Sequence, residues 1–96
     1  METAAFHEVH PGVILKEELE ARGLSANAFA LKLRVPPQRI QEIVAGKRAI
    51  SPETALRIGR SLGTGAKLRL GMQQAYDLRR AEMAHGAEID AEVAVA

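Results

Sequence analysis

Apolar residues recur along this chain at spacings of three and four, which is the period of a helix that buries one face. Stripes of this kind can be followed from residue 11 to about residue 84, and glycine, proline or a capping serine separates each from the next. The pattern predicts five helices and an all-α fold with a small core.

The second and third stripes are the most informative part of the pattern. Ser25 is the expected N-cap of the second helix, because its hydroxyl can accept a backbone N–H of the first turn. Arg34-Val35 interrupts that helix, and Pro36-Pro37 opens a new one, since proline fixes φ and lacks a donor. Gly46 stops the third helix. The buried positions of the two helices are Ala26, Phe29, Ala30 and Leu33, and then Ile40, Ile43 and Val44. The spacing predicts a helix-turn-helix over residues 25–45.

The outward face of the third helix carries long polar side chains. Gln38, Arg39 and Gln41 can pair with base edges in a major groove. Lys47 and Arg48 lie just beyond the same helix, where the phosphates of a bound duplex would pass. A small bundle with merely solvated faces is the alternative, but such faces more often carry Glu–Lys pairs four residues apart. DNA binding is therefore the favoured function.

The other stripes place one helix before this motif and two after it. The first helix is expected between Pro11 and Gly23, with His10 as a plausible N-cap. The fourth begins with Ser51 as its cap, a proline in the first turn, and ends at Gly63. The fifth is expected from about Ala66 to Ala84.

The fifth helix has two apolar faces, which indicates that one packs on its own domain and the other on a partner. Leu70 and Leu78 are the expected dimer interface, because one recognition helix reads too few base pairs and a two-fold dimer reads two half-sites. Beyond this helix, residues 85–96 are acidic and rich in alanine and valine; a disordered tail and a strand both remain open. The expected organisation is an N-terminal extension (1–10), a DNA-binding domain (11–84) and a tail (85–96).

Composition narrows the possible functions. The 96 residues are enough for one small domain, and aromatic residues are only 3%, which leaves no platform for stacking single-stranded bases. The chain has no cysteine, so disulfides and zinc–thiolate sites are excluded. It has no long apolar run and no secretory signal, so a cytoplasmic protein with no membrane partner is expected.

Charge is distributed unevenly although the net value is only +1. Residues 34–81 hold ten lysine or arginine side chains and three acidic ones. Residues 1–33 hold three lysine or arginine side chains and five acidic ones, and residues 82–96 hold four acidic ones and no lysine or arginine. Attraction to DNA depends on local cation density, so the basic middle is suited to it. The acidic ends are candidates for a cationic partner, or they only keep the protein soluble.

Several motifs in this order resemble the HigA/VapI antitoxins, which are lambda-repressor-like (Xre) helix-turn-helix proteins. The matching motifs are His10-Pro11-Gly12, Leu24-Ser25, Arg39-Ile40, Glu42-Ile43, Gly46-Lys47-Arg48, Thr54-Ala55-Leu56-Arg57 and Gln74-Ala75-Tyr76-Asp77-Leu78. The resemblance covers roughly residues 10–82. It implies a five-helix domain, a homodimer, repression of the protein's own operon through double-stranded operator DNA, and neutralisation of a HigB-type, RelE-like ribonuclease toxin.

The chain departs from this family at three places. Ala26 stands where a phosphate-binding glutamine is common, and Pro37 stands where a basic residue is common. The family's Ser-Pro and aromatic pair are replaced by residues 65–70, which removes a large apolar anchor. The expected base-reading set is therefore Gln38, Arg39 and Gln41. The expected phosphate contacts are Ser25, Asn27, Lys47 and Arg48.

A ribonuclease that binds a polyanion should have a basic surface, which an acidic antitoxin segment would attract. We favour the N-terminal segment over the tail, because Phe6 can supply an apolar anchor. The expected toxin-binding residues are Phe6, Glu8, Glu17 and Glu18. A solitary transcriptional regulator of the same fold, without a toxin, is the main alternative, and a module that binds only protein is a third.

Catalytic and metal sites are not expected. Ser51 and Ser61 have no histidine partner, and the adjacent Glu17 and Glu18 point to different sides of a helix. His7, Glu8 and His10 precede a Pro-Gly pair that disfavours the helix needed to bring two histidines together. The chain is expected to be no enzyme and to need no cofactor.

Overall fold

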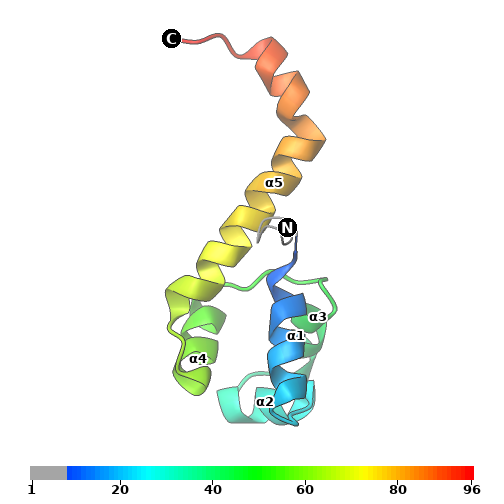
Figure 1. The fold of residues 1–96 in the computed structure, drawn as a ribbon, viewed down its shortest axis with the longest axis vertical. Coiled ribbons are helices and arrows are strands. Elements are labelled where there is room, and N and C mark those ends of the chain that lie inside the picture. Colours follow the sequence, from blue (N-terminus) through cyan, green and yellow to red (C-terminus); the bar gives the residue numbers. More distant parts are fainter. Residues whose placement is uncertain (1–8) are drawn as a thin grey trace, which may run out of the picture.

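The computed structural model describes residues 9–96, which form five helices in the order that the apolar stripes predict. They are α1 (Pro11–Ala21), α2 (Ala26–Leu33), α3 (Pro37–Val44), α4 (Pro52–Leu62) and α5 (Ala66–Glu92). Figure 1 shows α1 to α4 gathered in one body, from which the distal part of α5 projects. The all-α, five-helix prediction is confirmed.

The three expected N-caps are confirmed by their hydrogen bonds. The Ser25 hydroxyl accepts the amide of Ala28 at 3.0 Å, and the Ser51 hydroxyl accepts that of Thr54 at 3.2 Å. His10 caps α1 through its Nδ1 atom, which accepts the Gly12 amide at 2.9 Å. Each cap satisfies a donor that the first helical turn leaves open, so these helices begin where local chemistry requires.

The turn between α2 and α3 reverses the chain through Arg34, whose φ of 62° lies in the left-handed region. The amide of Val35 donates to the Ala30 carbonyl at 3.1 Å, and Arg57 of α4 donates to the Leu33 carbonyl at 2.8 Å. The end of α2 is thus capped from within the turn and from α4. This second contact fixes the motif onto the rest of the domain.

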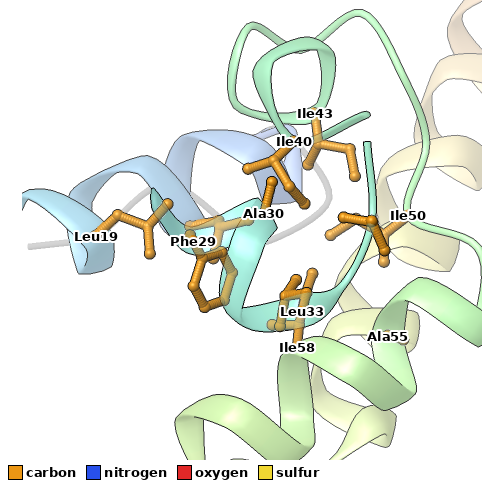
Figure 2. Packing of buried hydrophobic residues seen from close by; sticks show 11 residues of the cluster. Leu19, Phe29, Ala30, Leu33, Ile40, Ile43, Ile50, Ala55 and Ile58 are labelled. Atoms are coloured by element: carbon orange, nitrogen blue, oxygen red, sulfur yellow. The ribbon is translucent and has the colours of Figure 1, made fainter. Parts of the chain in front are cut away.

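The core lies where α1, α2, α3 and α4 meet, and Figure 2 shows its side chains converging from these helices. Its buried members are Leu15, Leu19, Phe29, Ala30, Leu33, Val35, Ile40, Ile43, Ile50, Ala55 and Ile58. Gly12 brings α1 against the end of α3, because a Cβ built there would lie 1.7 Å from the Ile43 carbonyl oxygen. A small core of this kind depends on such close helix contacts.

The expected end of the fifth helix near Ala84 is wrong. The helix continues to Glu92, so neither a disordered tail nor a strand describes residues 85–92. Gly86 lowers helix propensity without stopping the helix, and alanine and glutamate around it favour continuation. A contact of 3.5 Å between His85 Nδ1 and Glu88 Oε1 lies within this last stretch. Among residues 9–96, no helix combines the length and apolarity needed to cross a membrane.

Candidate nucleic-acid interface

The outer surface of α3 and the first turn of α2 form a continuous polar face. Gln38 and Gln41 are exposed on α3, Asn27 is exposed on α2, and Lys47 and Arg48 are exposed directly after α3. The amide nitrogen of Gln41 donates to the Asn27 side-chain oxygen, which links the two helices of the motif. The structure therefore brings two of the three predicted base-reading residues, Gln38 and Gln41, onto one surface with Asn27, Lys47 and Arg48.

Glu42 organises this face, and the sequence analysis did not single it out. One of its carboxylate oxygens accepts from Gln38 Nε2 at 2.9 Å and the other accepts from Arg48 Nε at 2.8 Å. The hydrogen bond from Arg48 and then that from Gln38 lower the pKa of Glu42 below its ordinary value, so it stays ionised at neutral pH. Its spacing of four from Gln38 could have indicated the contact.

Arg39 is less exposed than its predicted place on the outward face of α3 implies. It is half-buried at the junction of α3 and α4, where its NH1 atom lies 3.6 Å from Glu53 Oε1. Glu53 also accepts from Arg57 NH2 at 3.1 Å. In the free protein Arg39 is thus held beside a carboxylate of α4, and it must leave Glu53 or turn past it to contact a base.

Ser25 already uses its hydroxyl oxygen to cap α2, although the residue is exposed. A phosphate oxygen could accept a hydrogen bond from this hydroxyl without breaking the cap, since the cap uses the hydroxyl oxygen as an acceptor. The amide of Lys47 donates to the Glu42 carbonyl at 2.8 Å, which fixes the backbone after α3 and leaves its ammonium group exposed.

The other predicted site residues are dispersed. Leu78 is exposed on α5, whereas Leu70 is half-buried against the protein's own core and is therefore a poorer candidate for a dimer contact. Glu17 is exposed on α1, but Glu18 lies 2.7 Å from the buried guanidinium of Arg69. Phe6 and Glu8, like His7, lie outside the described residues.

Comparison with known proteins identifies the scaffold that carries this face. A helix-turn-helix family model matches residues 15–68, which include the whole of α2, α3 and α4. Virulence-associated protein I of Dichelobacter nodosus is 53% identical over 75 residues, which cover 77% of this chain and 69% of that protein. An antidote protein of the HigA family from Coxiella burnetii superimposes with a TM-score of 0.89 at 39% identity, over 93% of this chain and 98% of that one. The chain belongs to the HigA-type helix-turn-helix family.

A second solved relative was determined on nucleic acid. The Pseudomonas aeruginosa antitoxin HigA with the higBA promoter has a TM-score of 0.89 and 35% identity, over 91% of this chain and 96% of that one. Family and fold are those of DNA-binding helix-turn-helix antitoxins, so the prediction that the chain is not an enzyme is confirmed. The polar face of α2 and α3 carries amide and cationic side chains, which are groups that can contact DNA.

Proposed function

We propose that this protein is the antitoxin of a type II toxin–antitoxin system, which represses its own operon as a homodimer and neutralises a HigB-like, mRNA-cleaving toxin. The observation that carries the proposal is the tethered polar face of α3, with Gln38 and Arg48 held on Glu42 and Gln41 held on Asn27. The P. aeruginosa relative bound to its promoter supports the DNA part. An operator-binding repressor acts beside the chromosome, which implies a cytoplasmic protein.

In this proposal α3 enters the major groove and the first turn of α2 lies on the backbone. Gln41 and Gln38 contact base edges, and Arg39 exchanges Glu53 for a guanine or a phosphate. Ser25, Asn27, Lys47 and Arg48 contact phosphates. The amide–amide and amide–carboxylate bonds seen in the free protein keep these long side chains ordered, which reduces the entropy lost on binding.

A titration on operator and scrambled duplexes tests the base contacts. Gln41→Ala should weaken operator binding by about 1–3 kcal/mol, and binding to the scrambled duplex should change much less. Arg39→Ala should relax the preference at one position of the site. Gln74→Ala is the matched control, because Gln74 is an exposed glutamine on α5. Equal losses on both duplexes for Gln41→Ala, or no loss on either, would contradict α3 as the reading helix.

The toxin contact is proposed for the acidic N-terminal part, in which Glu17 presents an exposed carboxylate on α1. A toxin bound there leaves the polar face of α3 free, so a toxin–antitoxin complex could still bind DNA. Glu18 contributes less, because its carboxylate neutralises Arg69 within the same chain. Electrostatic attraction of a basic ribonuclease needs charge that the protein does not already use.

Calorimetry with the toxin encoded beside this chain tests the contact. Glu17→Lys and deletion of residues 1–9 should each weaken toxin binding, whereas the matched charge reversal Glu88→Lys and deletion of residues 86–96 should not. Loss with the tail deletion alone would move the contact to α5. Operator binding without any toxin binding would identify a solitary regulator instead.

A further inference from the structure

The end of α2 and one side of α4 enclose a hollow of about 430 Å³ on which cationic side chains gather. Lys32 and Arg34 line it from the end of α2, and Arg57 and Arg60 line it from α4. Among residues 9–96, none of those that line the hollow is acidic. Lys32, Arg34 and Arg60 also form no ion pair with any other residue of this range. Positive charge that lies unpaired around a concave surface attracts an anion.

The backbone of Arg34 gives a second, independent indication. Its φ of 62° and ψ of 44° lie in the left-handed region, where a Cβ crowds the backbone and glycine fits freely. Within residues 9–96, Arg34 is the one residue other than glycine with a positive φ. The turn would form more easily with glycine, so the backbone gives no reason for an arginine here. Strain of this kind is typical of positions where the side chain serves a function.

The size and walls of the hollow define the class of ligand. Its volume falls within the range of about 300–1,000 Å³ that is usual for small-molecule sites. Leu33 and Leu56 supply apolar walls, and Ser61 adds a hydroxyl group. Guanidinium groups bind phosphate through paired hydrogen bonds, and a lysine adds a point charge. The hollow therefore suits a molecule that joins a phosphate group to an apolar part.

We propose that this hollow binds a small organic phosphate and that the bound ligand weakens operator binding. Lys32, Arg34 and Arg60 contact the phosphate group, and the apolar part of the ligand lies against Leu33 and Leu56. The site itself is independent of the proposed function, whereas its effect on operator binding rests on that function.

Arg57 connects the hollow to the face of α3. Its NH1 atom donates to the Leu33 carbonyl at 2.8 Å, and its NH2 atom donates to Glu53 Oε2 at 3.1 Å. The other oxygen of Glu53 lies 3.6 Å from Arg39 NH1. One carboxylate is thus shared between a residue that lines the hollow and a predicted base-reading residue.

A phosphate beside Arg57 competes with Glu53 for the same positive charge. Glu53 then holds Arg39 more firmly, and Arg39 leaves it less readily for a base or a phosphate of DNA. The two positions of Arg39, on Glu53 or on DNA, are the states that the ligand and the operator favour in opposite directions. Ligand and operator should therefore weaken each other's binding.

Calorimetry on the full chain tests the site, with phenyl phosphate as the probe. Phenyl phosphate should bind more tightly than inorganic phosphate or phenol, because only this probe combines the charge with an apolar ring. Arg34→Gly should weaken its binding about tenfold, the equivalent of one hydrogen bond to a charged group. The same variant should melt no lower than the natural chain, since glycine relieves the backbone, so unfolding cannot explain the loss. Arg22→Gln is the matched control, as Arg22 is exposed but lies outside the hollow.

Two results of this titration would overturn the site. One is no binding of phenyl phosphate, and the other is equal binding by the natural chain and by Arg34→Gly and Arg60→Gln. If phenyl phosphate does not bind, and the two variants instead weaken binding to operator and scrambled duplexes alike, the hollow contacts the DNA backbone.

An operator titration at constant ionic strength tests the coupling. Saturating phenyl phosphate should weaken operator binding about fivefold, at the lower end of the usual coupling between two sites, because Glu53 is largely exposed to water. In Glu53→Gln the probe should still bind but should no longer change the operator affinity. An operator affinity that stays constant while the probe is bound would overturn the coupling. A chain that binds no operator under any condition would overturn the proposed function and the coupling together, while calorimetry decides the site separately.

Discussion

Arg69 is fully buried and forms an ion pair with the partly exposed Glu18, so the two residues should respond very differently to substitution. Arg69 is 0% exposed and its NH1 atom lies 2.7 Å from Glu18 Oε1, whereas the Glu18 side chain keeps 31% of its surface in solvent. Within residues 9–96 the guanidinium nitrogens of Arg69 have no hydrogen bond of good geometry. Within these residues, Glu18 therefore supplies the carboxylate that compensates the buried positive charge of Arg69.

Glu18→Gln should strongly lower the free energy of unfolding, because it leaves the fully buried Arg69 cation without a counter-charge. Removing one member of a buried pair costs about 3–5 kcal/mol, and the partial exposure of Glu18 places this case near 3 kcal/mol. For a domain of this size, a loss of that magnitude lowers the melting temperature by more than about 10 °C. Arg69→Met should cost less than about 1 kcal/mol, since the freed Glu18 carboxylate can turn to water.

A double-mutant cycle measured by urea unfolding checks this asymmetry. Glu18→Met/Arg69→Met should be as stable as the natural chain or more stable, because a well-packed apolar pair avoids the desolvation cost of two charges. Glu17→Gln is the matched control, as Glu17 is the exposed neighbour. A cost below about 1 kcal/mol for Glu18→Gln would refute the reasoning, because Arg69 would then have to reach solvent.

Three further predictions concern the start of α1, at Gly12 and His10, and the two basic residues that follow α3, Lys47 and Arg48. Gly12→Ala should lower unfolding free energy by about 1–3 kcal/mol, because the new Cβ meets the Ile43 carbonyl, and thermal melting against Val13→Ala as control checks it. Burial lowers the pKa of His10 against the opposing charge of Asp77, so the unfolded chain binds a proton more readily than the folded one. Stability should therefore fall as pH drops below about 6.5, and His10→Asn should flatten that part of a urea-unfolding pH series; an unchanged series would contradict the role of His10. Neutralising Lys47 and Arg48 together should weaken binding to all duplexes alike and reduce the log–log salt slope by roughly one unit per lost phosphate contact, whereas a loss confined to one sequence would indicate base contacts.

The starts of the helices and the position of the helix-turn-helix could be predicted from the sequence alone. Ser25 and Ser51 cap the helices that follow them, and the apolar stripe of each helix faces the core. These features depend on interactions within a few residues, which the order of amino acids specifies directly. The family resemblance added the domain type, because several motifs in a fixed order are more specific than any one of them.

The contacts that position the site were decided only by the tertiary structure. Glu53 and Arg39 lie on different helices, and Glu18 meets Arg69 across fifty residues of chain, so no local pattern connects them. Nor could a local pattern show that Leu70 is half-buried against the core of its own domain. Spacing along a helix predicts which side chains share a face, but the crossing of the helices determines which face meets which, and that is set by the packing of the whole core.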